Sequence, residues 1–202
     1  MTDYVAASKL SIASLSSEAF TEISERSGFV YVSESEWPFP FLTRKYIVFF
    51  SDFFFNDFNQ PEKEIPIQEQ VLILHDMQGG KESVSGVNWI AYREIPGASF
   101  YFNSFVKRAV DPFKKVFGSN AQSLNNVSGF LSGATIKEGN AGFEIILLPK
   151  APLRLILWDS DDEFLPKTTI FVLQTFSSIL SPEDVAWLSG MLVYRWFSLS
   201  YQ

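Results

Sequence analysis

The sequence contains no cysteine, and it contains a single histidine among 202 residues. The lack of cysteine excludes disulfides, thiolate nucleophiles, zinc ribbons and cysteine-held iron–sulfur clusters within this chain. One histidine excludes zinc sites that need two. Two acids of the turn over residues 159–163 could hold magnesium, but a solvated acidic turn is favoured. We expect no metal site and no cofactor.

The chain also lacks a positive net charge and a long apolar run. Its net charge of -7 argues against nucleic-acid binding, which needs a basic surface to displace counterions. Charge and proline interrupt the apolar stretches, as at Glu144, Pro149 and Arg154, so nothing reaches the ~18 to 20 apolar residues of a membrane span. The first residues include Asp3 where a signal peptide is basic. We expect a cytoplasmic protein that binds neither nucleic acid nor membranes.

Phenylalanine, by contrast, is abundant, with 21 residues. Hydrophobic residues make up 47% of the chain and charged residues 19%, which is typical of a globular protein. Because phenylalanine is large and wholly apolar, most of these rings should lie in the core. A surplus of exposed rings would instead form an interface.

The order of local patterns predicts an α+β fold. Strand-like runs occur in clusters and helical patterns in separate blocks, which does not fit an alternating doubly wound sheet. We expect a single domain over residues 16–202, with a mainly antiparallel or mixed sheet packed with several helices, after a flexible N-terminus over residues 1–15. Residues 37–40, Trp-Pro-Phe-Pro, predict a rigid connector.

Helical periodicity and cap residues predict helices over 16–27, 68–78, 103–118 and 121–131, and from Ser181 onward. Apolar and β-branched runs predict strands over 29–32, 46–50, 53–55, 88–92, 134–137, 143–148 and 153–158. The run over 169–176 fits either a strand or a buried helix, and we favour a strand.

Common catalytic motifs are missing from the sequence. There is no G-x-G-x-x-G and no G-x-S-x-G, and Gly79-Gly80-Lys81 lacks the upstream glycine of a phosphate-binding loop. The basic pairs Arg44-Lys45, Lys107-Arg108 and Lys114-Lys115 are either local patches or solvated faces, and the acidic total favours solvated faces.

His75 is the side chain best able to move a proton near neutral pH. It lies beside the apolar stripe of its predicted helix, so it is either a base or ligand contact in a cleft, or a half-buried structural histidine bonded to backbone.

The stretch from Asn88 to Gly97 offers a second candidate. Strand alternation places Trp89, Ala91 and Arg93 on one face and Ile90, Tyr92 and Glu94 on the other. An arginine and a tryptophan on one face suit an anionic or planar ligand. The guanidinium can form two hydrogen bonds to a carboxylate or phosphate, and the indole can stack on a planar group. Tyr101 follows closely. The alternative is a surface Arg–Glu pair beside an aromatic core.

The order of these landmarks resembles domain-of-unknown-function family 3786, which is bacterial and archaeal. The resemblance covers about residues 20 to 197 and rests on Thr43-Arg44-Lys45-Tyr46, the helical Leu74-His75, the stretch 89–97, Phe100-Tyr101-Phe102, and 155–158 with its acidic turn. Thr43 and Lys45 replace the usual Gly and Glu of the family's strand motif. The four-cysteine iron–sulfur segment of many relatives is missing, so the resemblance does not support electron transfer. The resemblance implies a fold and a candidate site at His75, Trp89, Arg93 and Glu94.

Three functions remain open at this point. The first is a non-enzymatic module that binds a small molecule or cofactor, with a corrinoid-related ligand as one option. Its candidate ligand-binding residues are His75, Trp89, Arg93, Glu94 and Tyr101. The second is an interaction domain that forms a homo-oligomer or heteromer through surplus aromatic rings. The third is an enzyme with His75 as general base and Glu94 or Asp159 as its partner. We favour the binding module and assign no catalytic residue.

Overall fold

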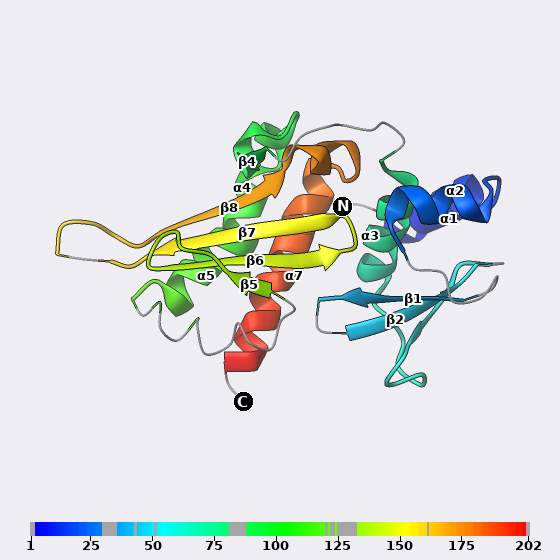
Figure 1. The fold of residues 1–202 in the computed structure, drawn as a ribbon, viewed down its shortest axis with the longest axis horizontal. Helices are drawn as coiled ribbons and strands as arrows, with labels where there is room; N and C mark the ends of the chain where they lie inside the picture. The colour runs from blue at the N-terminus through cyan, green and yellow to red at the C-terminus, as the bar shows by residue number, and fades with distance from the viewer. Residues whose placement is uncertain are drawn as a thin grey trace.

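The computed structural model describes residues 3–29, 36–42, 44–50, 52–80, 88–119, 121, 124, 133–160 and 162–200. Over these residues the chain forms two antiparallel sheets and a set of helices, which confirms the predicted α+β fold. One sheet and its helices come from the N-terminal part of the chain, and the other sheet lies beside them against a helical layer from the C-terminal part (Figure 1). Buried side chains from both sheets belong to one continuous hydrophobic core.

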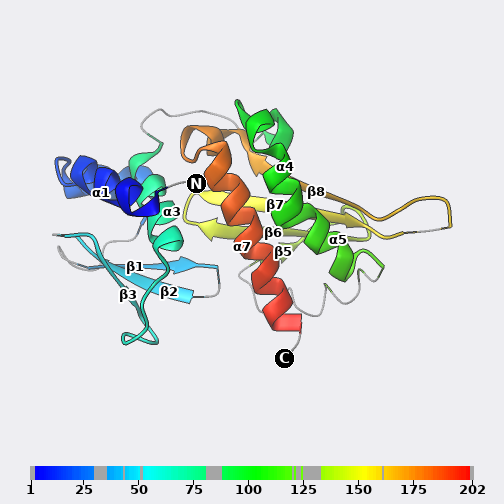
Figure 2. The same cartoon turned by 180° about the vertical axis from the view of Figure 1, so that it is seen from behind.

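The larger sheet has the strand order β4-β8-β7-β6-β5, and every neighbouring pair is antiparallel. Its strands are β4 (Trp89–Ala91), β5 (Gly133–Thr135), β6 (Ala141–Leu148), β7 (Ala151–Trp158) and β8 (Lys167–Leu173). The helices α4 (Phe102–Phe105), α5 (Asp111–Phe117) and α7 (Pro182–Ser200) cover one of its faces (Figure 2). Apolar and β-branched runs predicted β6, β7 and β8, and many of their residues are buried in the core.

Helix α7 confirms the clearest helical prediction. Ser181 caps its first turn, since the backbone N–H of Asp184 donates to the Ser181 hydroxyl at 3.2 Å. The predicted apolar stripe Val185, Leu188, Leu192 and Trp196 is completely buried. These side chains fasten α7 to the sheet.

The smaller sheet has the order β1-β2-β3, with β1 (Glu36–Phe41), β2 (Arg44–Phe49) and β3 (Phe54–Asp57). The prediction of a rigid connector over residues 37–40 was wrong, because these residues belong to β1. Pro38 lies opposite Ile47 and Pro40 opposite Lys45 in the β1–β2 register. Proline removes a backbone donor, and the sheet tolerates two prolines here because β1 is an edge strand.

The expected flexible N-terminus is also corrected, because residues from Tyr4 onward form helix α1 (Tyr4–Leu15). The Asp3 carboxylate caps it by accepting from the Ala6 N–H at 3.0 Å. Its buried residues are Ser8, Ser11 and Leu15, and the helix packs along α3 (Ile67–Gln78). Because two of these three are serines, the sequence carries no apolar stripe that would have predicted the helix.

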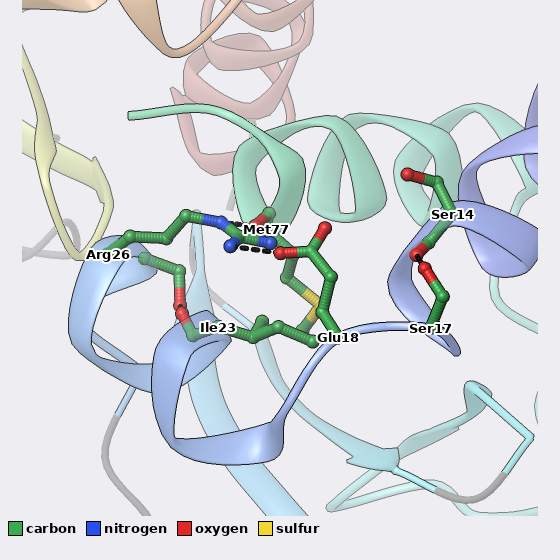
Figure 3. A network of polar contacts seen from close by, with 7 residues as sticks. Ser14, Ser17, Glu18, Ile23, Arg26 and Met77 are labelled. Atoms are coloured by element: carbon green, nitrogen blue, oxygen red, sulfur yellow. Dashed lines mark hydrogen bonds and ion pairs between the residues drawn. The ribbon is translucent and has the colours of Figure 1, made fainter. Parts of the chain in front are cut away.

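Helix α2 (Phe20–Ser27) is bound to the end of α3 through Arg26 (Figure 3). Its Nε donates to the Met77 carbonyl at 2.6 Å, and its guanidinium pairs with Glu18. The carbonyl at the C-terminal end of α3 thereby gains a charged donor, which is favourable at a helix C-terminus.

The remaining predictions divide between confirmed elements and residues outside the described ranges. Helix 68–78 is α3, and strands 46–50 and 53–55 correspond to the β2–β3 hairpin. The helix expected over 103–118 begins as α4 and ends as α5, with a π-helical segment over Val106–Val110 between them. Most of the strand expected over 29–32 and of the helix expected over 121–131 lies outside the described residues.

Candidate functional site

Strand β4 is short, and its end opens the edge of the larger sheet. The chain leaves the sheet after Ala91 in a 3-10 turn, Tyr92–Glu94, and the Glu94 carboxylate accepts from the Ala91 N–H at 2.6 Å. β4 therefore pairs only with residues 171–173 of β8. Residues 167–170 of β8 have no strand beside them on that side within the described part of the chain.

A groove of about 450 Å³ lies along this free part of β8. Its floor is residues 167–170, and its opposite wall comes from the helical layer, including Phe102, Phe105 and the π-helical residues Val106 and Val110. π-helical turns are rare and often lie at functional sites. The volume falls within the range of roughly 300 to 1,000 Å³ that is usual for ligand pockets.

Three cationic residues line the groove, Arg93, Lys114 and Lys167, and the Lys167 ammonium lies 5.4 Å from the centre of the Trp158 ring. The Arg93 guanidinium lies 5.1 Å from the centre of the Phe102 ring, which orients it by a cation–π contact. Lys114 has an ion pair with Asp111 at 3.4 Å, but both side chains are substantially exposed and such pairs are weak. None of the described residues that line the groove is acidic. The groove therefore offers a positive field to a ligand although the whole chain is negative.

Tyr92 gives the groove a rigid end. Its ring is stacked on Phe105 with 3.8 Å between ring centres, and its hydroxyl donates to the Pro182 carbonyl at 2.8 Å. Burial raises the pKa of Tyr92 to about 12, so this hydroxyl stays protonated and keeps its hydrogen bond. The hydrogen bond ties the groove to the first turn of α7.

Of the five predicted ligand-binding residues, Arg93 is the one that lines the groove. The prediction that Trp89 and Arg93 share a strand face was wrong, because the strand ends between them. Trp89 instead lies under the Arg154 guanidinium, 4.2 Å from its ring centre, and Arg154 pairs with Glu144 at 2.9 Å. Strand alternation places these three side chains on the sheet face opposite the helical layer.

Two further predicted residues, Glu94 and Tyr101, have local roles. Glu94 closes the 3-10 turn described above, and the half-buried Tyr101 packs against the hydrophobic core. The structure therefore does not gather the five predicted residues into one site.

His75 lies at a different place, on α3, where it contacts α7. Its Nδ1 is 3.0 Å from Oδ1 of Asp184, and the side chains are 30% and 11% exposed. The hydrogen bond to Asp184 raises the pKa of His75, with burial acting in the opposite direction. An imidazole oriented by a carboxylate can act as a general base, and the same pair can also hold two helices together.

Asp184 replaces both partners that we expected for His75. Glu94 is engaged with its own turn, and Asp159 accepts from the Ala121 N–H at 3.0 Å. The other oxygen of Asp184 accepts from the Ser181 hydroxyl at 2.7 Å. Asp184 thus completes a capping box and orients His75 at the same time.

A buried polar cluster joins β2 to α3. In the sequence, only the strand motif over residues 43–46 pointed to it. The Tyr46 hydroxyl accepts from Arg44 Nη1 at 3.0 Å and donates to Glu69. A cavity of about 270 Å³ separates Arg44 and Glu69 from the side chains of α7, including Met191 and Arg195. Tyr46 is completely buried, and this burial, with the hydrogen bond to Glu69, raises its pKa.

Asp76 follows His75 and is the least expected buried group. It is 1% exposed, and neither carboxylate oxygen has a hydrogen-bond partner. Burial raises its pKa to about 7, and Lys150 opposes the shift. The predicted apolar stripe of Ile67, Val71 and Leu74 lies on the opposite side of α3, so the sequence did not predict that Asp76 is buried.

The aromatic run around Phe53 is divided between core and surface. Phe53 and Phe55 are buried, whereas Phe54 and Phe58 are 57% and 50% exposed. The Lys45 ammonium lies 4.3 Å from the centre of the Phe58 ring. Two exposed rings beside a lysine form a smaller apolar surface than the sequence suggested.

Two further classes of site receive no support from the described residues. They contain no group of three or more histidine or acidic side chains placed to hold a metal ion. None of the helices among them is both long and apolar enough to cross a membrane.

Comparison with known proteins assigns the chain to a family. A family model described as a domain of unknown function (DUF3786) matches residues 19–195. The chain belongs to the DUF3786 family. This confirms the resemblance that the landmark residues predicted. Searches of curated proteins and of solved structures found no match to this DUF3786 member.

Proposed function

We propose that this DUF3786 member is a non-enzymatic binding module for an anionic ligand, which it holds in the groove beside β8. The observation that carries the proposal is that Arg93, Lys114 and Lys167 all line one groove, which has no acidic residue in its described lining. In a chain of net charge -7, such a local excess of cations raises the concentration of anions at the groove.

The three cations differ in what they contribute. The planar guanidinium of Arg93 can bind a carboxylate or phosphate through two parallel hydrogen bonds, and Phe102 holds it in place. Lys114 and Lys167 act as point charges on flexible stems. The aromatic and aliphatic side chains of the helical wall exclude water from one side of the ligand, which strengthens these contacts.

Isothermal titration calorimetry with pyrophosphate and citrate tests the proposal. A corrinoid, the larger ligand that the resemblance suggested, is titrated in parallel. We expect at least one small anion to bind, and the double substitution Lys114→Gln/Lys167→Gln to weaken binding by at least tenfold. Arg93→Gln should weaken it by a similar factor. Raising the salt concentration should weaken binding to the native chain.

Lys115 provides the matched control, because it is exposed on the same helix as Lys114 and does not line the groove. Lys115→Gln should leave affinity within twofold of the native value. If no anion binds, or if Lys115→Gln costs as much as the groove substitutions, the proposed function is wrong.

A second candidate function is proton transfer with His75 as base. The 3.0 Å contact with Asp184 supports it, because an adjacent acid is what a catalytic histidine needs. Turnover of generic esters and amides that His75→Gln abolishes would support this candidate, whereas equal turnover in both proteins would remove it.

A further inference from the structure

The free edge of β8 presents backbone groups to the groove. The N–H of Gln174 donates to the Asn88 carbonyl at 2.8 Å, so Gln174 faces β4. Alternate residues of a strand point their N–H and C=O groups to the same side. Val172, Ile170 and Thr168 therefore face that side as well.

Only part of this edge is occupied. Val172 lies opposite Ile90 of β4, whereas Ile170 and Thr168 lie beyond the end of β4 and have no strand opposite them within the described residues. Both residues line the groove. An extended chain placed there would continue the line of β4 and pair with β8.

One polar group at this part of the edge is buried without a partner. Ile170 and Thr168 are 2% and 9% exposed, and the Thr168 hydroxyl has no hydrogen-bond partner. A buried donor or acceptor without a partner costs about 1–3 kcal/mol. A small anion can accept from an N–H but cannot donate to a C=O, whereas an extended peptide offers both groups in alternation.

We propose that the occupant of the groove is an extended acidic segment of a partner protein, which adds a strand to the free edge of β8. This inference rests on the proposed function, because it places the ligand at the same cations. Strand addition supplies main-chain hydrogen bonds, and the pockets beside the edge select side chains. Arg93, Lys114 and Lys167 select acidic side chains at these positions.

The cations also explain why a neutral apolar strand is a poor occupant. Lysine at a sheet edge discourages unwanted strand pairing, because an apolar partner cannot neutralise the ammonium group. Lys167 stands at the start of the free edge and is exposed. An acidic strand converts this barrier into an attraction.

Fluorescence anisotropy with a labelled peptide of alternating Glu and Val, six residues long, tests the inference. We expect binding at least tenfold tighter than that of glutarate, which carries carboxylates and no peptide backbone. A peptide of alternating Lys and Val should not bind. Lys167→Glu should reduce affinity for the acidic peptide at least tenfold, with Lys115→Glu as the matched control.

Two N-methylated forms of the acidic peptide test the role of the backbone. One is methylated at its odd-numbered residues and the other at its even-numbered residues. One set of amides must face β8, so one of the two peptides should bind at least tenfold more weakly while its charge is unchanged. Hydrogen exchange of the native chain provides an independent readout, and the amides of Thr168 and Ile170 should become protected on peptide addition.

The outcomes separate the two proposals. Equal binding of all acidic peptides regardless of methylation, with no protection at Thr168 and Ile170, overturns strand addition and leaves anion binding intact. Failure of every anion and peptide to bind overturns both. Protection of the same amides without peptide, together with a dimer in light scattering, would show that a second copy of the chain occupies the edge, and the partner segment would be wrong.

Discussion

The imidazole of His75 on α3 and the carboxylate of Asp184 in the first turn of α7 lie within hydrogen-bond distance, at 3.0 Å. The pair joins the helices beside the smaller sheet to the helical layer of the larger one. Asp184 is two residues after Pro182, whose carbonyl accepts from the Tyr92 hydroxyl at the groove. The first turn of α7 is therefore the point where both candidate sites meet.

The protonation of His75 can be measured directly, because the chain has one histidine. We expect its ring-proton NMR signal to titrate with a pKa above the ordinary value of 6.5. Asp184→Asn should return the pKa toward that value, since it removes the largest cause of the shift. A native pKa at or below 6.5 would contradict the pair.

The same shift predicts a pH dependence of stability. A raised histidine pKa stabilises the folded state fully below about pH 6.5, and this contribution is lost as pH rises through the folded pKa. Removing a hydrogen bond to a charged group costs about 1.5–3 kcal/mol, with the lower end expected for this half-exposed ring. We expect His75→Gln to lower the unfolding free energy at pH 6 and to have a smaller effect at pH 9, as measured by urea denaturation.

Asp76 should produce a pH dependence in a lower range. Its pKa is raised to about 7 from 3.8, so the folded state binds a proton that the unfolded state has released. The unfolding free energy should therefore fall as pH rises from about 4 to 7, by ~4 kcal/mol for a shift of this size. Asp76→Asn should remove this slope and stabilise the protein at pH 8. Parallel slopes in the native and substituted chains would contradict the buried carboxyl.

The single hydroxyl group of Tyr46 should contribute strongly to the free energy of unfolding. Tyr46→Phe removes the hydroxyl that donates to Glu69, whose side chain is 16% exposed and keeps its ion pair with Arg44 at 3.7 Å. We expect a loss of about 1–3 kcal/mol in urea denaturation. Lys45→Gln, at the exposed neighbouring position of the same strand, removes an exposed cation–π contact with Phe58 and should cost at most about 1 kcal/mol.

Gly79 should tolerate no side chain. A Cβ there would lie 2.3 Å from the Ile179 carbonyl oxygen and 2.5 Å from its Cα, both backbone atoms. We expect Gly79→Ala to cost ~3 kcal/mol through overpacking. Gln78→Ala, at the preceding and half-buried position, is the control and should cost far less. A thermal midpoint for Gly79→Ala within a degree of the native value would disprove this close approach.

Much of the fold could be predicted because local patterns and tertiary packing agree. The apolar runs of β6 and β7 and the cap and apolar stripe of α7 are each contained in a short segment. β1 and α1 were missed because they depart from those patterns. Prolines at positions 38 and 40 argue against a strand, and serines occupy the buried face of α1.

The candidate sites could be predicted only in part, because their partners are distant in the sequence. His75 was predicted, but Asp184 lies 109 residues further along the chain. Arg93 was predicted, but Lys114 belonged to a basic pair interpreted as a solvated face, and Lys167 carried no signal. A 3-10 turn after Ala91, which strand alternation cannot predict, decided that Arg93 rather than Trp89 reaches the groove.

The two prolines of β1 have a consequence for how this protein behaves at high concentration. Being two positions apart, Pro38 and Pro40 direct their nitrogens to the same side, away from β2. The outer border of the smaller sheet therefore lacks two donors in succession, and an incoming chain would find little to bind there. Fibrous self-association that starts from this border should be disfavoured, and replacing both prolines with valine should shorten the lag before aggregation.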